Sequence, residues 1–268
     1  MASSEGDAPA PLPPSELGTK DWDTLYAREL ANQQRSPEDS GTVWFSETDA
    51  EGNMARLAEE NVKEGKCRAS VLDLGCGNGS LLGFFREVGW RGRALGVDYS
   101  RLSIELARRV QACGSCLREG DGGDDDRDEE EDDEKEEEGK RREIELAVWD
   151  IINDPLDKVL SPYNMPQGWD VVLDKGTFDA ISLARSSTTA AADDDDDNNN
   201  APCAAYVSRV HSLTRDIFVI TSCNWTQDEL IRWFSDAGFV VAATAPYRSF
   251  TFGGHKGQAV STVCFRKL

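Results

Sequence analysis

The sequence predicts an α/β fold: a mostly parallel β-sheet with helices on both faces and an antiparallel hairpin at one edge. Short apolar runs alternate with segments of helical spacing through most of the chain, which is typical of parallel strands joined by helices. The last two apolar runs, 239–244 and 260–265, are separated only by a glycine-rich connection, which favours a hairpin. At 268 residues the chain is long enough for one domain of this kind.

Each predicted element rests on a local pattern. Two helices precede the first strand, over residues 20–34 and 49–64, with the short apolar segment 41–45 between them. Strands are predicted over residues 70–75, 93–98, 144–149, 169–173 and 217–220. Helices are predicted over residues 81–88, 100–111, 178–183 and 227–237, with one more before the fifth strand. Gly89 and Gly238 follow two of these helices and are suitable residues to end them.

The junction between the first strand and its helix is the most informative segment. Gly75, Gly77 and Gly79 follow an apolar run that contains Asp73. Glycine adopts backbone angles closed to other residues and carries no Cβ, so a ligand can approach such a loop closely. A second apolar run ends at Asp98, where a carboxylate suits the two hydroxyls of a ribose. A turn without a ligand and a nicotinamide dinucleotide site are the alternatives.

Three features favour a methyl-donor site over a nicotinamide site. Ser80 stands where the dinucleotide fingerprint requires its third glycine. Asp73 would repel a pyrophosphate, but it suits the ammonium of a methionine group. Asp150 ends a third apolar run, where a nicotinamide enzyme has no standard use for an acid. Together these motifs resemble the class I S-adenosylmethionine-dependent methyltransferases.

This resemblance implies a Rossmann-like sheet of seven strands and S-adenosylmethionine as the cofactor. By the same resemblance the glycine loop lies against the methionine part, Asp98 holds the ribose, and Asp150 accepts from the adenine amino group. Tyr99 or Trp149 lies along the adenine. The full set of implied donor-binding residues is Trp44, Phe45, Asp73, Gly75, Cys76, Gly77, Asn78, Gly79, Asp98, Tyr99, Trp149, Asp150 and Asp174.

A second motif, LDKGTFDAISL at residues 173–183, lies just after the fourth predicted strand. It closely resembles the lysine N-methyltransferases that modify translation elongation factor 1-alpha, in the branch that fungi share with animals. Residues 15–30, 220–226 and 250–257 are similar to the same branch, so the resemblance covers nearly the whole chain. It implies a protein-lysine N-methyltransferase with the elongation factor as its protein partner. The candidate catalytic residues are Asp174, Phe178, Asn224 and Trp225.

Several of these residues have a purely structural alternative. Asp174 either orients the substrate amine or caps a helix. Trp44 and Phe45 either cover the donor or pack into the core. Asn224 and Trp225 either line a substrate channel or cap the helix that follows. For the whole chain, the alternatives are a small-molecule methyltransferase and a non-catalytic donor-binding adaptor in intracellular transport.

The net charge of −21 is concentrated in two tracts. Residues 121–138 hold 14 acidic side chains and two basic ones, and residues 193–197 are five aspartates. Segments of this composition cannot bury enough apolar surface to pack. We therefore predict a disordered tail over 1–16 and a single domain over 17–268, with low-complexity insertions at about 119–142 and 186–200.

Composition also bears on partners and compartment. The acidity of the chain argues against a nucleic-acid substrate, since a phosphate backbone needs a basic face to release its counterions. Seven cysteines without framework spacing, and no apolar segment at the amino terminus, predict a reduced, cytoplasmic protein. No apolar run approaches the length of a membrane span. With only two histidines, far apart in the sequence, no metal site is expected.

Overall fold

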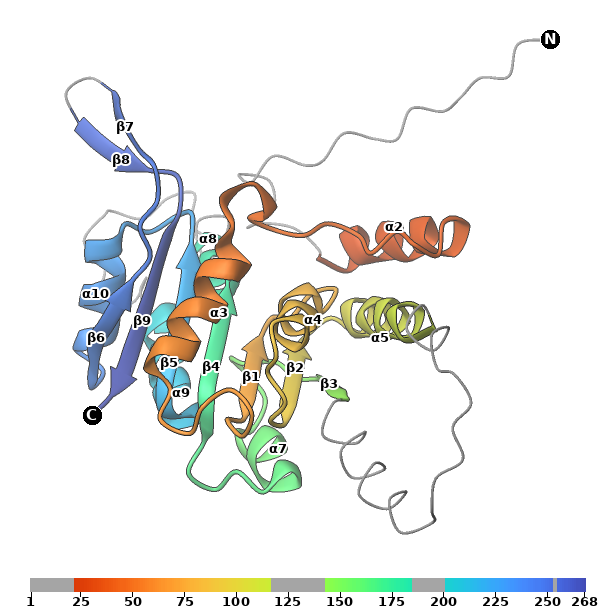
Figure 1. Cartoon of the computed structure of the whole chain (residues 1–268), viewed down its shortest axis with the longest axis horizontal. Helices are drawn as coiled ribbons and strands as arrows, with labels where there is room; N and C mark the ends of the chain where they lie inside the picture. Colours follow the sequence, from red (N-terminus) through yellow and green to blue (C-terminus); the bar gives the residue numbers. More distant parts are fainter. Residues whose placement is uncertain (1–21, 117–142, 185–200, 253–254) are drawn as a thin grey trace.

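The computed structural model describes residues 22–116, 143–184, 201–252 and 255–268. Its main sheet has seven strands in the order β3-β2-β1-β4-β5-β9-β6, which confirms the predicted fold class (Figure 1). The predicted tail and the two predicted insertions lie outside the described residues, so those expectations stay predictions. Within the described parts of the chain, no helix is long and apolar enough to span a membrane.

Five parallel strands and two antiparallel ones make up the sheet. The parallel strands are β1 (Val71–Leu74), β2 (Ala94–Asp98), β3 (Ile144–Val148), β4 (Trp169–Lys175) and β5 (Thr214–Ser222). Strand β9 (Ser261–Lys267) runs antiparallel between β5 and the edge strand β6 (Phe239–Thr244). The predicted antiparallel pair is therefore confirmed. Its connection contains a ribbon that the sequence did not indicate, formed by β7 (Ser249–Phe252) and β8 (His255–Gln258), which projects from the sheet (Figure 1).

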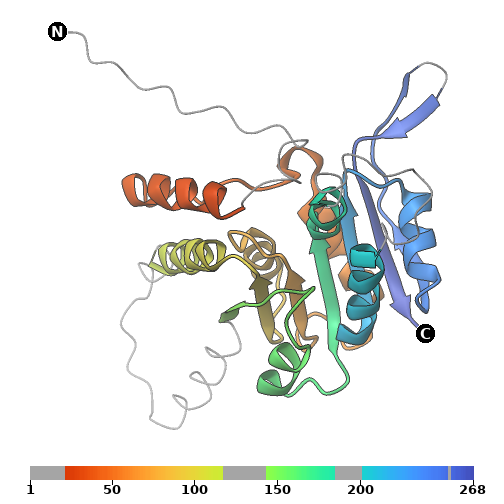
Figure 2. The same ribbon diagram turned by 180° about the vertical axis from the view of Figure 1, so that it is seen from behind.

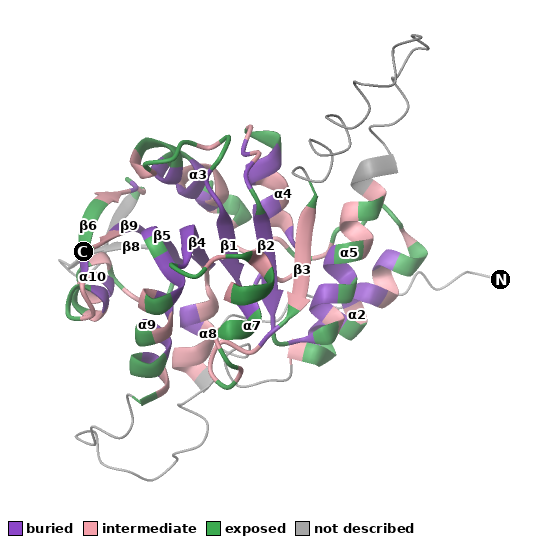
Figure 3. Cartoon of the chain, turned by 90° about the horizontal axis from the view of Figure 1, so that it is seen from below, coloured by how far each residue is buried: buried purple, intermediate pink, exposed green. Residues whose placement is uncertain are grey.

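Helices cover both faces of this sheet, as Figures 2 and 3 show. They are α2 (Trp22–Arg35), α3 (Ala50–Asn61), α4 (Ser80–Glu87), α5 (Arg101–Cys116), α7 (Asp157–Leu160), α8 (Thr177–Ala184), α9 (Ala201–Leu213) and α10 (Gln227–Ser235). Two short 3-10 turns, η1 (Ser46–Thr48) and η3 (Ser161–Tyr163), complete the described elements. Local sequence explains one helix well: Thr226 and Glu229 form a reciprocal capping box that starts α10.

The apolar core lies in two layers, one on each side of the sheet. On one side α3 and α4 bury Met54, Leu57 and Phe85 against β1, β4 and β5. On the other side α8, α9 and α10 bury Phe178, Tyr206 and other aromatic rings against the same strands. Because both faces are covered, the central strands read as continuous apolar runs rather than as alternating ones.

The strand order places a ligand crevice beside β1. The chain runs outward from β1 to β2 and β3 on one side, and to β4 and β5 on the other. At this reversal the connections leave in opposite directions, and a crevice opens beyond the carboxyl ends of the strands. Leu74 at the end of β1 is in register with Asp174 near the end of β4. The glycine loop and the 173–183 motif therefore meet at one place.

Candidate active site

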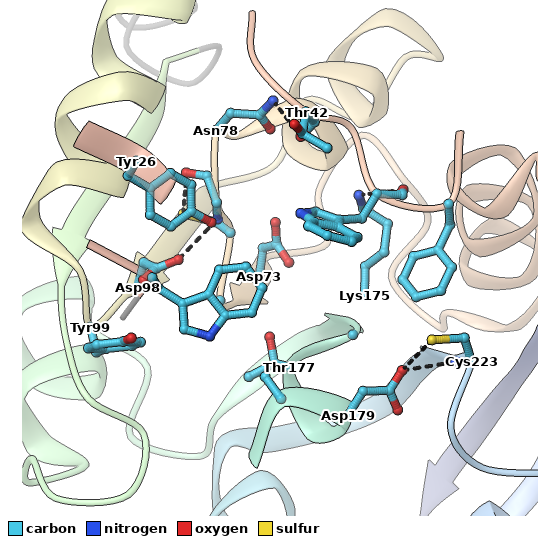
Figure 4. A pocket seen from close by; sticks show the side chains of 18 of the residues that line it. Tyr26, Thr42, Asp73, Asn78, Asp98, Tyr99, Lys175, Thr177, Asp179 and Cys223 are labelled. Atoms are coloured by element: carbon cyan, nitrogen blue, oxygen red, sulfur yellow. Dashed lines mark hydrogen bonds between the residues drawn. The ribbon is translucent and has the colours of Figure 1, made fainter. Parts of the chain in front are cut away.

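A cavity of about 150 Å³ that opens to solvent lies at this crevice (Figure 4). Five parts of the chain build it: the amino-terminal segment, the glycine loop, the end of β2, the junction of β4 with α8, and the residues after β5. Its lining residues are Trp22, Tyr26, Thr42, Trp44, Phe45, Asp73, Gly75, Cys76, Gly77, Asn78, Asp98, Tyr99, Lys175, Gly176, Thr177, Asp179, Ala180, Leu183, Cys223 and Asn224.

The glycine loop has the backbone that the sequence predicted. Gly75, Gly77 and Gly79 have φ values of 68°, 56° and 81°, a region that favours glycine. Gly77 N donates to Asp98 Oδ2 at 3.2 Å, which ties the loop to the end of β2. Asn78 Nδ2 donates to the carbonyl of Thr42 at 3.2 Å, which ties it to the amino-terminal segment. The loop is held in place before any ligand binds.

Close packing beneath the loop explains the first glycine. Thr177 Oγ1 donates to the carbonyl of Leu74 at 2.6 Å and joins the start of α8 to the end of β1. A Cβ at position 75 would lie 2.1 Å from that Thr177 oxygen. The packing of α8 therefore requires a residue without a Cβ at position 75, as the close approach of a ligand does.

Asp73 is a buried acid that faces the cavity with an unpaired oxygen. Its side chain is 2% exposed, and Oδ2 has no hydrogen-bond partner among the described residues. Burial, more than any neighbour, raises the pKa of Asp73 well above its usual value, and the Lys175 ammonium opposes that shift. A ligand ammonium would satisfy this oxygen. The orphaned carboxylate thus fits the methionine end of the predicted donor.

Asp98 and Tyr99 form one end of the cavity (Figure 4). Asp98 Oδ1 accepts from Ser100 N at 2.9 Å, and Oδ2 accepts from Gly77 N. Burial raises the pKa of Asp98, while these donors act in the opposite direction. Tyr99 is 52% exposed and presents a ring beside the carboxylate. A carboxylate next to an aromatic face suits a ribose attached to a purine.

Aromatic residues of the amino-terminal segment cover the cavity. Trp22 and Tyr26 of α2 line it together with Trp44 and Phe45 of the following loop. The Trp22 and Trp44 rings lie 6.0 Å apart, edge to face. Lys175 Nζ donates to the carbonyl of Trp44 at 3.1 Å and holds that loop down. This position favours the covering role over the core-packing alternative for Trp44 and Phe45.

Asp174 lies below the cavity and does not line it. Its Oδ1 accepts from Thr177 N at 2.7 Å, and its Oδ2 accepts from Phe178 N at 3.0 Å and from the Tyr206 hydroxyl. Burial is the main cause that raises the pKa of Asp174 to about 7. With both oxygens engaged and no exposure, Asp174 cannot reach a substrate in this structure. The geometry favours the helix-capping alternative over a role in orienting the amine.

Other predicted residues also lie away from the cavity. The Phe178 ring is fully buried and stacks on Trp225 at 5.6 Å, so this pair supports α8 from behind. Trp149 is buried, and its indole donates to the carbonyl of Pro155. Asp150 accepts hydrogen bonds from the loop that follows β3. Roles for these side chains at a donor or substrate stay predictions, and so does that of Gly79, which starts α4.

Ten of the lining residues were not among the predicted ones, and Tyr26, Lys175, Thr177 and Asp179 are four of them. Asp179 lies at the end of the cavity opposite Asp98, beside Cys223 (Figure 4). Lys175 is 10% exposed and pairs with Glu51 at 3.2 Å. Three of the four belong to or flank the 173–183 motif, so the motif pointed to this wall although the particular side chains were not identified.

The strand order, the glycine loop and the acid that ends β2 together define a class I methyltransferase. A family model described as a methyltransferase domain matches residues 45–186. A curated relative, the protein-lysine N-methyltransferase EFM4 of Saccharomyces cerevisiae, is 36% identical over 96% of this chain and 97% of its own. The EEF1A lysine methyltransferase 2 of Homo sapiens is 33% identical over 95% of this chain and 88% of its own. The chain belongs to this family of protein-lysine N-methyltransferases.

A solved structure supports the fold on its own. The magnesium protoporphyrin IX methyltransferase of Synechocystis PCC 6803, determined with bound SAH, superposes with a TM-score of 0.51. The match covers 92% of this chain and 97% of that chain at 13% sequence identity. At this level of identity the likeness extends to the architecture and not to the substrate.

Proposed function

We propose that this chain transfers methyl groups from S-adenosylmethionine to a lysine of translation elongation factor 1-alpha. The observation that carries the proposal is identity of 31–36% along about 95% of the chain to relatives named for these activities. The cavity supports it, because one end suits a nucleoside, while the wall at the other end carries Asp179 beside the apolar side chains of Ala180 and Leu183.

The described residues fit the donor. Asp98 would hold the ribose hydroxyls and Tyr99 the adenine, while the orphaned oxygen of Asp73 would receive the methionine ammonium. Bound there, S-adenosylmethionine supplies an activated methyl group on a positively charged sulfur. The protein contributes position and exclusion of water: Trp44 and Phe45 cover the reacting region, and the ties of Asn78 keep the loop in shape.

The substrate amine must lose its proton to solvent before its nitrogen can attack the methyl group. A free lysine has a pKa of about 10.4, so nearly every lysine is an ammonium at neutral pH. An apolar, aromatic surrounding disfavours the charged form and lowers this pKa. Trp44, Phe45, Ala180 and Leu183 give the cavity such a surrounding.

The test uses the elongation factor purified from cells that lack the endogenous activity. Incubation with the enzyme and labelled donor should place label on a lysine of the factor, which peptide mass spectrometry then locates. Asp98→Ala serves as the matched enzyme control and should give no label. A complete set of lysine methylations on the factor from cells that lack this chain would rule the substrate out.

A further inference from the structure

We propose that Asp179 is the substrate-binding residue that receives and orients the ε-ammonium of the target lysine. This inference rests on the proposed function and names the group at the same site that recognises the lysine. It assigns to Asp179 the role that the 173–183 motif suggested for Asp174.

The position of Asp179 within the cavity carries the first part of the argument. Asp98 and Tyr99 lie at one end of the cavity and Asp179 with Cys223 at the other, while Asp73 and Thr177 lie between them (Figure 4). A donor held by Asp98 and Asp73 therefore leaves the Asp179 end to the second reactant. Of the described side chains that line that end, Asp179 alone bears a carboxylate.

The neighbours of Asp179 suit a lysine side chain in particular. Asp179 and Leu183 are four residues apart on α8 and share one face of the helix with the adjacent Ala180. This face offers apolar surface for four methylene groups and a carboxylate for the charged end. Lysine buries its methylene stem along apolar surface while its head keeps polar contacts.

Hydrogen bonds hold the carboxylate in a fixed direction. Ser222 Oγ donates to Oδ1, while Cys223 N donates to Oδ2 at 2.8 Å and Cys223 Sγ lies 3.4 Å from the same atom. The side chain is 5% exposed yet lines the cavity. A preorganised acceptor of this kind loses little entropy when it binds an ammonium.

No cation among the described lining residues neutralises the negative charge of Asp179. Lys175, the nearest lining ammonium in the described wall, is already paired with Glu51 at 3.2 Å. From β4 and α9, Asp174 and Tyr206 face the same region, and they share one hydrogen bond between them. Burial raises the pKa of Asp179, and its hydrogen-bond donors counter this shift. An incoming ammonium would further favour the ionised carboxylate.

The competing explanation is structural, since Asp179 also anchors residues 222–224 to α8. Two variants separate the explanations. Asp179→Asn keeps the shape but removes the charge. Ser222→Ala keeps the carboxylate and removes the hydrogen bond that Ser222 donates to it, together with the two that Ser222 Oγ accepts from Asn224 N and Trp225 N. Each is compared with the full-length wild-type chain by calorimetry for the donor, and by steady-state methylation over a range of pH.

We expect Asp179→Asn to lower kcat/KM by at least about tenfold while the donor Kd changes less than about twofold, because a charge-assisted hydrogen bond to the substrate is lost. A carboxylate stabilises the ammonium and raises its pKa, so its removal should also move the acid limb of the kcat profile to lower pH. Ser222→Ala keeps the carboxylate but holds it less firmly, so it should leave that limb in place and lower kcat/KM less than Asp179→Asn does.

Three results would overturn the inference: near-wild-type activity of Asp179→Asn, equal losses in both variants without a shift of the pH profile, or a parallel loss of donor affinity. The assay runs on the elongation factor and, separately, on a lysate from cells that lack the chain. If wild type labels a lysine of another protein only, the proposed substrate fails and Asp179 is tested on that protein. A wild type that labels no lysine overturns both proposals.

Discussion

Asp174→Asn separates helix capping from catalysis at the most ambiguous acid of the motif. The carboxylate accepts from Thr177 N, from Phe178 N and from the Tyr206 hydroxyl. Asparagine has a single acceptor oxygen, so its amide nitrogen would face the Phe178 N–H and one buried donor would lose its partner. An unsatisfied buried donor costs about 1–3 kcal/mol. We expect the free energy of unfolding to fall by this amount under acidic conditions.

The loss should shrink as the pH rises. Burial raises the pKa of Asp174 to about 7 in the folded protein, against about 3.9 in an unfolded chain. This carboxyl therefore stabilises the fold fully below its unfolded pKa, and that contribution declines as the pH rises through the folded pKa. Between about pH 5.5 and about pH 8.5 the decline amounts to roughly 2 kcal/mol. Asparagine does not ionise, so the free energy of unfolding of the variant should not show this decline.

Urea unfolding at the two pH values measures the stability change, and methylation at the higher pH measures turnover. A cap predicts a smaller destabilisation at high pH and turnover within about threefold of wild type. A loss of turnover of about a hundredfold with unchanged stability would refute the capping interpretation. It would instead support a role for Asp174 in orienting the substrate amine. Equal destabilisation at both pH values would refute the argument from burial of the charge.

Two further substitutions test the donor end of the cavity. Asp98→Ala should weaken donor binding by at least about tenfold in calorimetry, since charge-assisted hydrogen bonds are worth about 1.5–3 kcal/mol each; an unchanged affinity would contradict the ribose assignment. Gly75→Ala should lower the melting temperature more than Gly65→Ala, because its Cβ would lie 2.1 Å from Thr177 Oγ1, whereas position 65 has a similar φ of 72° and open space around it. Gly65→Ala should cost only the backbone strain of about 1–2 kcal/mol, and equal losses would show that the Thr177 contact is unimportant.

Local patterns were sufficient to predict the core of the fold. The apolar run before Gly75 became β1, the glycines took positive φ, and Asp98 came to the end of β2 beside the loop. These features depend on neighbours in sequence and on the general rule that parallel strands direct their carboxyl ends to one edge. The same rule predicted that the 173–183 motif lies at the crevice, because the motif follows a parallel strand, and no tertiary contact had to be known.

Features that depend on tertiary contacts were beyond this reasoning. The Trp22 and Tyr26 side chains share an apolar helix face, which spacing alone assigns to the core. This face does pack on Leu106 of α5, but the two rings also line the cavity, which spacing does not show. Asp174 and Asp179 are both acids of one motif, and only the start of α8 decides which is sealed beneath and which reaches the cavity. That choice follows from the hydrogen bonds of Thr177 and Phe178, which no periodicity reveals.

The cavity is assembled from both sides of the stretch by which sequence comparison identifies the domain. The family model begins at residue 45 and ends at 186. Five lining residues lie outside that stretch: Trp22, Tyr26 and Thr42 before it, and Cys223 and Asn224 after it. A fragment trimmed to the recognised boundaries would keep the glycine loop and lose its cover, together with the Ser222 and Cys223 anchors of Asp179. The residues that select among substrates in this family should therefore be sought in the segments before and after the matched methyltransferase domain.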